Sequence, residues 1–104
     1  MIAEKVFSYN KLIDIQKDLK DNKLILSDLV NYYLDRIKKN LHLNAFLEVF
    51  EDELLQKTAV IEQKIKAGTA GKLAGMVLGI KDNISYKGHK LSASSKILDG
   101  YVSI

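Results

Sequence analysis

The residues of this chain whose types and spacing could do chemistry lie in its last quarter, where an apolar run leads directly into polar residues. The run Leu73 to Ile80 contains only apolar residues and glycine, and Lys81, Asp82 and Asn83 follow it without a break. A lysine at the end of a buried strand can act as a general base when its surroundings favour the neutral amine. A surface turn that ends a buried strand is the simpler interpretation.

The other candidate groups are isolated. Ser92, Ser94 and Ser95 could include a nucleophile, but no histidine or other base completes a triad pattern with them. His42 and His89 lack the flanking carboxylates or second histidine that a metal site usually shows. We therefore expect both histidines to lie in surface loops, and we expect no metal site and no bound cofactor.

Composition narrows the class of protein further. The chain has 104 residues, 47% of them hydrophobic, which suits one small globular domain. The net charge of +3 comes almost entirely from lysine, with Arg36 the single arginine, so recognition of nucleic-acid bases is not favoured. Cysteine is absent, which excludes disulfides, thiolate metal sites and a cysteine nucleophile. No apolar run approaches the roughly 20 residues of a membrane helix, and we expect a cytoplasmic protein.

Helical periodicity dominates the first two thirds of the chain. Apolar residues recur at helical spacing in three segments, near residues 8–20, 27–40 and 52–67. Ser8 and Ser27 are the expected N-caps of the first two helices, and Asp52 is expected to begin the third. Gly68 is expected to end the third helix, because glycine readily adopts the left-handed conformation found there.

The remaining segments have the patterns of strands and turns. Residues 44–50 alternate aromatic and branched side chains, which predicts a strand, and a second strand is predicted near residues 75–81. Five of the six glycines fall between Gly68 and Gly88, as expected for a part of the chain rich in turns. Their spacing matches neither phosphate-binding glycine motif, so a nucleotide site is not expected. From the residues alone, the chain is a small α/β domain with one unusually placed lysine.

Three segments resemble the amidase signature family. "LAGMVLGIKDNI" (73–84) is similar to the family segment in which Ile-Lys-Asp-Asn ends a strand, and "GHKLSASSKILDGYVS" (88–103) is similar to the stretch that follows it. "SDLVNYYLDRIKKNLHLNAFLEVFEDELLQKTA" (27–59) resembles the N-terminal helix pair and the strand between its helices. Within the family, the resemblance is greatest to the A-type subunits of glutamyl-tRNA(Gln) amidotransferases.

The resemblance implies a fold and a place in it. Family members are α/β/α sandwiches with a mixed central sheet, so we expect α/β architecture. Residues 1–104 are expected to form a single N-terminal segment of a longer amidase domain whose catalytic part lies downstream. Val77 departs from the family pattern, since proline is usual at its position.

The resemblance also implies a mechanism. Amidase signature enzymes use a serine, a second serine after a cis peptide bond, and a lysine, and the lysine corresponds to Lys81. A free lysine, with a reference pKa of about 10.4, is only about 0.1% neutral near pH 7.4, so burial must favour the neutral amine by roughly 4 kcal/mol. We expect the apolar run Met76 to Ile80 to supply that burial. The two serines are expected downstream of Ile104, and residues 1–104 alone are expected to be inactive.

The function implied is hydrolysis of glutamine to supply ammonia, which converts Glu-tRNA(Gln) to Gln-tRNA(Gln). The implied partners are the B and C type subunits of the amidotransferase, with misacylated tRNA bound through the complex. ATP and Mg²⁺ are expected to be used by the partner subunit. Two alternatives remain open: another amidase signature hydrolase, or a noncatalytic module that presents the helices Ser27 to Asn40 and Asp52 to Ala67 to a partner protein.

Overall fold

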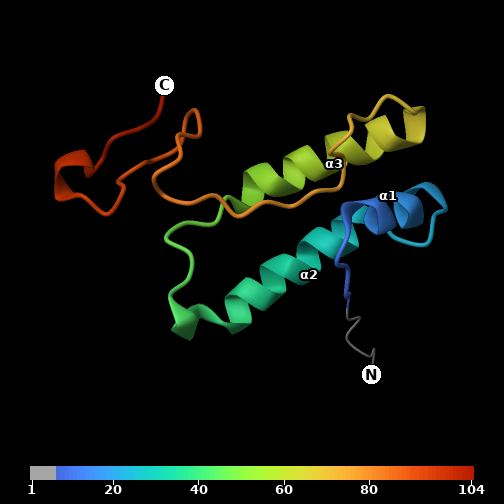
Figure 1. The fold of residues 1–104 in the computed structure, drawn as a ribbon, viewed down its shortest axis with the longest axis horizontal. Coiled ribbons are helices and arrows are strands. Elements are labelled where there is room, and N and C mark those ends of the chain that lie inside the picture. Colours follow the sequence, from blue (N-terminus) through green and yellow to red (C-terminus); the bar gives the residue numbers. More distant parts are fainter. Residues whose placement is uncertain (1–6) are drawn as a thin grey trace.

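Three α-helices and two short 3-10 helices account for the regular structure. The structure, a computed structural model, describes residues 7–104 (Figure 1). The elements in chain order are α1 (Leu12–Lys20), α2 (Leu26–Lys39), η1 (Leu41–Leu43), α3 (Glu51–Ala67) and η2 (Lys96–Leu98). Each of the three predicted helices is therefore confirmed, with boundaries that differ at the N-terminal ends.

The core lies where α3 packs against α1 and α2. The apolar stripe predicted for the second helix is buried there, and Leu29 and Val30 are 0% and 1% exposed. Partly buried side chains of α3, including Leu54, Ile61 and Ile65, pack against the core that contains this stripe. Burial of the α2 stripe thus orients α3, and the chain that follows α3 runs back along these helices (Figure 1).

The N-terminus of α2 is capped from another helix. The helix begins at Leu26, so Ser27 lies in its first turn, and the prediction that Ser27 is the N-cap is wrong. Ser27 N donates instead to Glu62 Oε1 of α3, at 2.7 Å. A carboxylate satisfies a free amide and complements the positive end of the helix as a local cap would. Ser8 is likewise not an N-cap, because α1 begins at Leu12 and Lys11 precedes it in extended conformation.

The C-terminal ends of the helices match the sequence closely. Asn40 ends α2, and Gly68 ends α3 with φ = +73°, in the left-handed region. Gly68 N donates to Ile65 O and Thr69 N to Lys64 O, at 3.2 and 2.9 Å, which satisfies carbonyls that the last helical turn leaves free. Glycine is suited to this site because it has no Cβ to strain.

Neither predicted strand is present in residues 7–104. Residues 44–50 and 75–81 contain no strand, and the ladder contact found in this part of the chain is a single antiparallel bridge between Lys90 and Val102. The prediction of two strands is therefore wrong for these residues, and the α/β/α sandwich is not seen. A strand needs a hydrogen-bonded neighbour, and β propensity describes only how well one segment would suit such pairing.

The chain after α3 turns back along the helices toward the N-terminal end of α3 (Figure 1). Gln16 of α1 donates to Lys72 O and Ala74 O, at 2.8 and 3.1 Å, and so holds the beginning of this return. Gly75 is buried against α1, where a Cβ would lie 2.9 Å from Leu19 Cδ1. The polar residues that follow Ile80 therefore lie near the N-terminal end of α3 (Figure 1).

Candidate functional site

Lys81 lies in a turn at the end of the returning segment. Ile84 N donates to Lys81 O at 2.9 Å and closes the turn, while the Lys81 side chain is exposed. The apolar run before it does not enclose it, since Leu78 is 68% exposed and Ile80 is 47% exposed. Within the part of the protein that the structure describes, the run Met76 to Ile80 therefore leaves this lysine exposed.

Asp82 binds the loop that contains the serines. Its Oδ1 accepts from Ser92 N at 3.1 Å, its Oδ2 accepts from the Ser92 hydroxyl, and its main-chain carbonyl accepts from Ala93 N at 3.0 Å. The hydroxyl and then the amide of Ser92 lower the pKa of Asp82, because both stabilise the carboxylate. This pair ties residue 82 to residue 92 and so closes the loop between them.

None of the three serines is paired with a base that could activate it. The Ser92 hydroxyl donates to Asp82, Ser95 Oγ accepts from Ile97 N at 3.3 Å at the start of η2, and Ser94 is exposed with φ = +59°. A serine nucleophile needs a neighbouring general base, and an ionised carboxylate held by two donors is a poor one. The structure thus gives Ser92 and Ser95 roles in loop geometry.

The two histidines differ sharply. His42 is exposed in η1, as expected, whereas the His89 side chain is only 18% exposed and pairs with a carboxylate of α3. The prediction that His89 is a simple surface-loop residue is therefore wrong. No group of three His, Cys, Asp or Glu side chains within residues 7–104 could hold a metal ion.

The lysines of the last quarter of the chain are each exposed: Lys81, Lys87, Lys90 and Lys96.

The carboxylate that His89 meets is Glu53, in the first turn of α3. Glu53 Oε2 lies 2.6 Å from His89 Nε2, and Glu53 Oε1 lies 2.6 Å from Lys57 Nζ and accepts from the Tyr86 hydroxyl at 2.9 Å. Lys57 Nζ also donates to the Tyr86 hydroxyl. We call Glu53, Lys57, Tyr86 and His89 the Glu53 cluster.

Charge pairing in the Glu53 cluster shifts two pKa values apart. Hydrogen bonds from Lys57 and then Tyr86 lower the pKa of Glu53 to about 2, and bonds to Glu53 and Tyr86 raise the pKa of Lys57 to about 12. Both groups are therefore ionised across the physiological range. The cluster was not predicted from the sequence. The contact between Glu53 and Lys57 could be predicted from the sequence, because they lie four residues apart on a helix. The approach of these two residues to Tyr86 and His89 could not.

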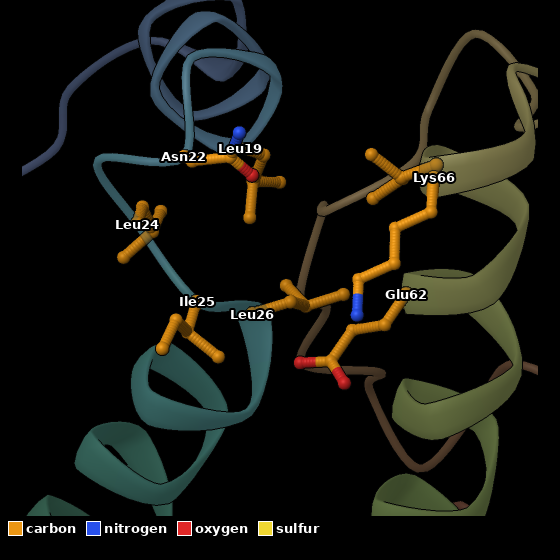
Figure 2. Close-up of a pocket in the computed structure, with 8 residues that line it drawn as sticks. Leu19, Asn22, Leu24, Ile25, Leu26, Glu62 and Lys66 are labelled. Carbon is orange, nitrogen blue, oxygen red and sulfur yellow. The ribbon is translucent and has the colours of Figure 1, made fainter.

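The structure also contains an apolar cavity that none of these groups lines. It has a volume of about 320 Å³ and lies between the α1–α2 connection and α3 (Figure 2). Leu19, Leu24 and Leu26 contribute its apolar wall, and Glu62 and Lys66 reach toward it from α3. Glu62 already accepts a hydrogen bond from the Ser27 amide, so one of the two charged groups here serves to cap α2.

No helix in residues 7–104 has both the length and the apolar character needed to cross a membrane.

Comparison with known proteins gives a family. The model of the Amidase family matches residues 28–104. Similar curated proteins include the A-type subunits of the glutamyl-tRNA(Gln) amidotransferases of Chlorobium luteolum, 39% identical over 92 residues, and of Chlorobium phaeobacteroides, 36% identical over 92 residues. Both alignments cover 88% of this chain and 19% of the relative. The corresponding protein of Chlorobaculum parvum is 37% identical over 97 residues, which is 92% of this chain and 20% of that protein.

The chain thus spans about a fifth of the length of the curated relatives it matches. No solved structure matches it. The matched residues contain the Lys81-Asp82-Asn83 motif, the Asp82 loop and all of α3. The resemblance noted in the sequence is therefore confirmed, and this chain belongs to the Amidase family.

Proposed function

We propose that the natural gene product containing these residues is the glutamine-hydrolysing subunit of a tRNA-dependent amidotransferase. It releases ammonia from glutamine, and the ammonia converts Glu-tRNA(Gln) to Gln-tRNA(Gln). The observation that carries the proposal is the similarity of 88% of the chain to proteins named as the A-type component of that enzyme, over a stretch that includes Lys81.

In this proposal Lys81 is the general base. It accepts a proton from a serine, and that serine in turn activates the nucleophilic serine that attacks the glutamine amide. Both serines are supplied by other parts of the natural product. The low-dielectric surroundings that a lysine base needs are also supplied there, because the Lys81 side chain is exposed within residues 7–104.

The partners follow from the same proposal. Subunits of the B and C types complete the enzyme, and misacylated tRNA is bound through the complex. ATP and Mg²⁺ act in the partner subunit, where they activate the carboxyl group of the attached glutamate. Nothing in this part of the mechanism requires a cofactor on residues 1–104.

Replacement of Lys81 tests the proposal. In the natural product assembled with its partner subunits, Lys81→Ala should lower kcat for glutamine hydrolysis by about 100-fold to 10,000-fold, the usual contribution of a general base. Lys87→Ala is the matched control, because Lys87 is also exposed and follows Lys81 by six residues. Circular dichroism should show the same helix content in both variants. An unchanged kcat in Lys81→Ala contradicts the assignment of the base.

The substrate distinguishes the second candidate function. An amidase signature hydrolase with another amide substrate would share Lys81 and the fold, so activity on glutamine must be compared with activity on simple aryl and aliphatic amides. The proposal predicts a higher kcat/KM for glutamine. A noncatalytic module that uses the α2 and α3 surfaces would hydrolyse neither kind of amide and would be unaffected by Lys81→Ala.

A further inference from the structure

The Glu53 cluster joins two parts of the chain that are otherwise far apart in sequence. Glu53 lies in the first turn of α3, while Tyr86 and His89 follow the Lys81 turn. Three donors converge on the two oxygens of the one carboxylate, and every distance involving those oxygens is 2.9 Å or less. Each donor that is held by this carboxylate limits how far its own segment can move.

Aromatic packing encloses the same contact. The ring of His89 lies parallel to the ring of Tyr86, with centroids 4.5 Å apart and an interplanar angle of 3°. The ring of Phe50, at the start of α3, is a second neighbour, and its centroid lies 3.8 Å from that of His89. The His89 side chain is 18% exposed and the Glu53 side chain is 35% exposed, so water screens this contact less than it screens a fully exposed ion pair.

Two sets of hydrogen bonds fix the chain on either side of the segment between His89 and Lys81. Ser103 N donates to His89 O and Gly88 N donates to Ser103 O, at 2.9 and 2.7 Å, so the His89 backbone is fixed against the C-terminal end of the described chain. Three residues after His89, Ser92 donates to both oxygens of Asp82. Asp82 is the neighbour of Lys81, and the path from α3 to the lysine is therefore continuous.

We infer that Glu53 is a positioning residue, which fixes residues 81–93 on α3 through Tyr86 and His89 and thereby sets the location of Lys81. This inference rests on the proposed function in so far as Lys81 is the base, while the fixing of residues 81–93 is a property of the fold alone. Helix α3 is a suitable anchor, because its other face packs on the buried stripe of α2.

The role of Glu53 differs from that of Glu51, two residues earlier on α3. Glu51 forms an ion pair with Lys38 of α2 at 3.0 Å. This pair joins two helices and does not involve residues 81–93. The two carboxylates are of the same type, on the same helix and in the same first turn. Glu51→Ala is therefore a matched control for Glu53→Ala.

The experiment uses the natural gene product with its partner subunits and compares Glu53→Ala, His89→Phe and Glu51→Ala with the wild type. His89→Phe keeps a ring against Tyr86 and Phe50 but removes the bond to Glu53, so it tests the polar contact with little loss of packing. The first measurement is amide hydrogen exchange over residues 81–93. The second is the separate effect on kcat and KM for glutamine.

We expect exchange over residues 81–93 to accelerate about tenfold in Glu53→Ala and His89→Phe and to stay at the wild-type rate in Glu51→Ala. We expect kcat to fall about 10-fold to 100-fold in the first two variants with KM within about twofold, since a small displacement of a base costs rate rather than ground-state binding. Glu53→Gln keeps the shape of the side chain and one oxygen that accepts hydrogen bonds. Its kcat should therefore lie between those of Glu53→Ala and the wild type.

Unchanged exchange over residues 81–93 in Glu53→Ala would overturn the inference, because the cluster would then fix nothing. Faster exchange with an unchanged kcat would also overturn it, because the lysine would be located by other contacts. A wild-type protein that hydrolyses no amide would refute the proposed function and the positioning of a base. In that case the exchange measurement would still decide whether Glu53 fixes residues 81–93.

Discussion

Replacement of Gly75 by alanine is the sharpest test of how the chain returns along the helices. Gly75 is buried with φ = +91°, and an added Cβ would lie 2.9 Å from Leu19 Cδ1 and 3.3 Å from Ile15 Cγ2. The left-handed conformation costs a residue with a Cβ about 1–2 kcal/mol. Overpacking of a filled site costs about 1–3 kcal/mol more. The terminal methyl of Leu19 can shift toward the cavity that Leu19 lines, so we expect the cost of overpacking to lie in the lower part of this range.

Two other glycines separate these costs. Gly68 has φ = +73° with nothing within 4 Å of its added Cβ, whereas Gly71 has neither a positive φ nor a neighbour within 4 Å. Alanine also reduces the entropy of the unfolded chain, which stabilises by about 0.4–1 kcal/mol where no strain arises. We therefore expect Gly71→Ala to be neutral or slightly stabilising, Gly68→Ala to cost up to about 1 kcal/mol, and Gly75→Ala to cost about 2–4 kcal/mol.

The assay is equilibrium unfolding in urea, followed by the helical signal in far-ultraviolet circular dichroism. With a slope of about 1–3 kcal/mol/M for a small protein, Gly75→Ala should lower the midpoint by roughly 0.7–4 M at unchanged slope. The order of the three midpoints carries the test. If Gly75→Ala and Gly68→Ala unfold at the same urea concentration, the steric contact with Leu19 contributes nothing and the reasoning fails.

Three further predictions concern the core, an exposed ion pair and pH. Leu29→Ala should destabilise the chain by about 2–5 kcal/mol because its side chain is 0% exposed, whereas Ile13→Ala, at 70% exposure, should stay within about 0.5 kcal/mol; urea midpoints compare the two. Loss of the exposed Lys38–Glu51 pair, through Lys38→Ala, should cost less than about 1 kcal/mol and should vanish in high salt. The pKa of Glu53 is lowered from 4.5 to about 2, so its contribution to stability is present above about pH 4.5 and is lost as the pH falls toward 2. The difference in Tm between wild type and Glu53→Gln should shrink over that range, and a constant difference would contradict the pairing.

The helices and the lysine motif could be predicted from the sequence because their signals are local. A helix pairs each amide with a carbonyl four residues away. The apolar stripe of α2 and the end of α3 at Gly68 therefore depend only on residues close in sequence. The motif around Lys81 is equally local, and it sufficed to indicate the family. The N-terminal ends of the helices were less well predicted, because a serine near a helix start is only one of several groups that can satisfy the first amides.

Tertiary structure decided what depends on partners distant in sequence. Residues 44–50 alternate as a strand does, and residues 75–81 form the apolar run of a buried strand, but no neighbouring strand in residues 7–104 accepts their hydrogen bonds. The pairing that would make them strands is not a property of either segment. The cap of α2 is a carboxylate 35 residues away, on α3. The Glu53 cluster likewise joins residues more than 30 positions apart, and a sequence gives the types of such residues but not their distances.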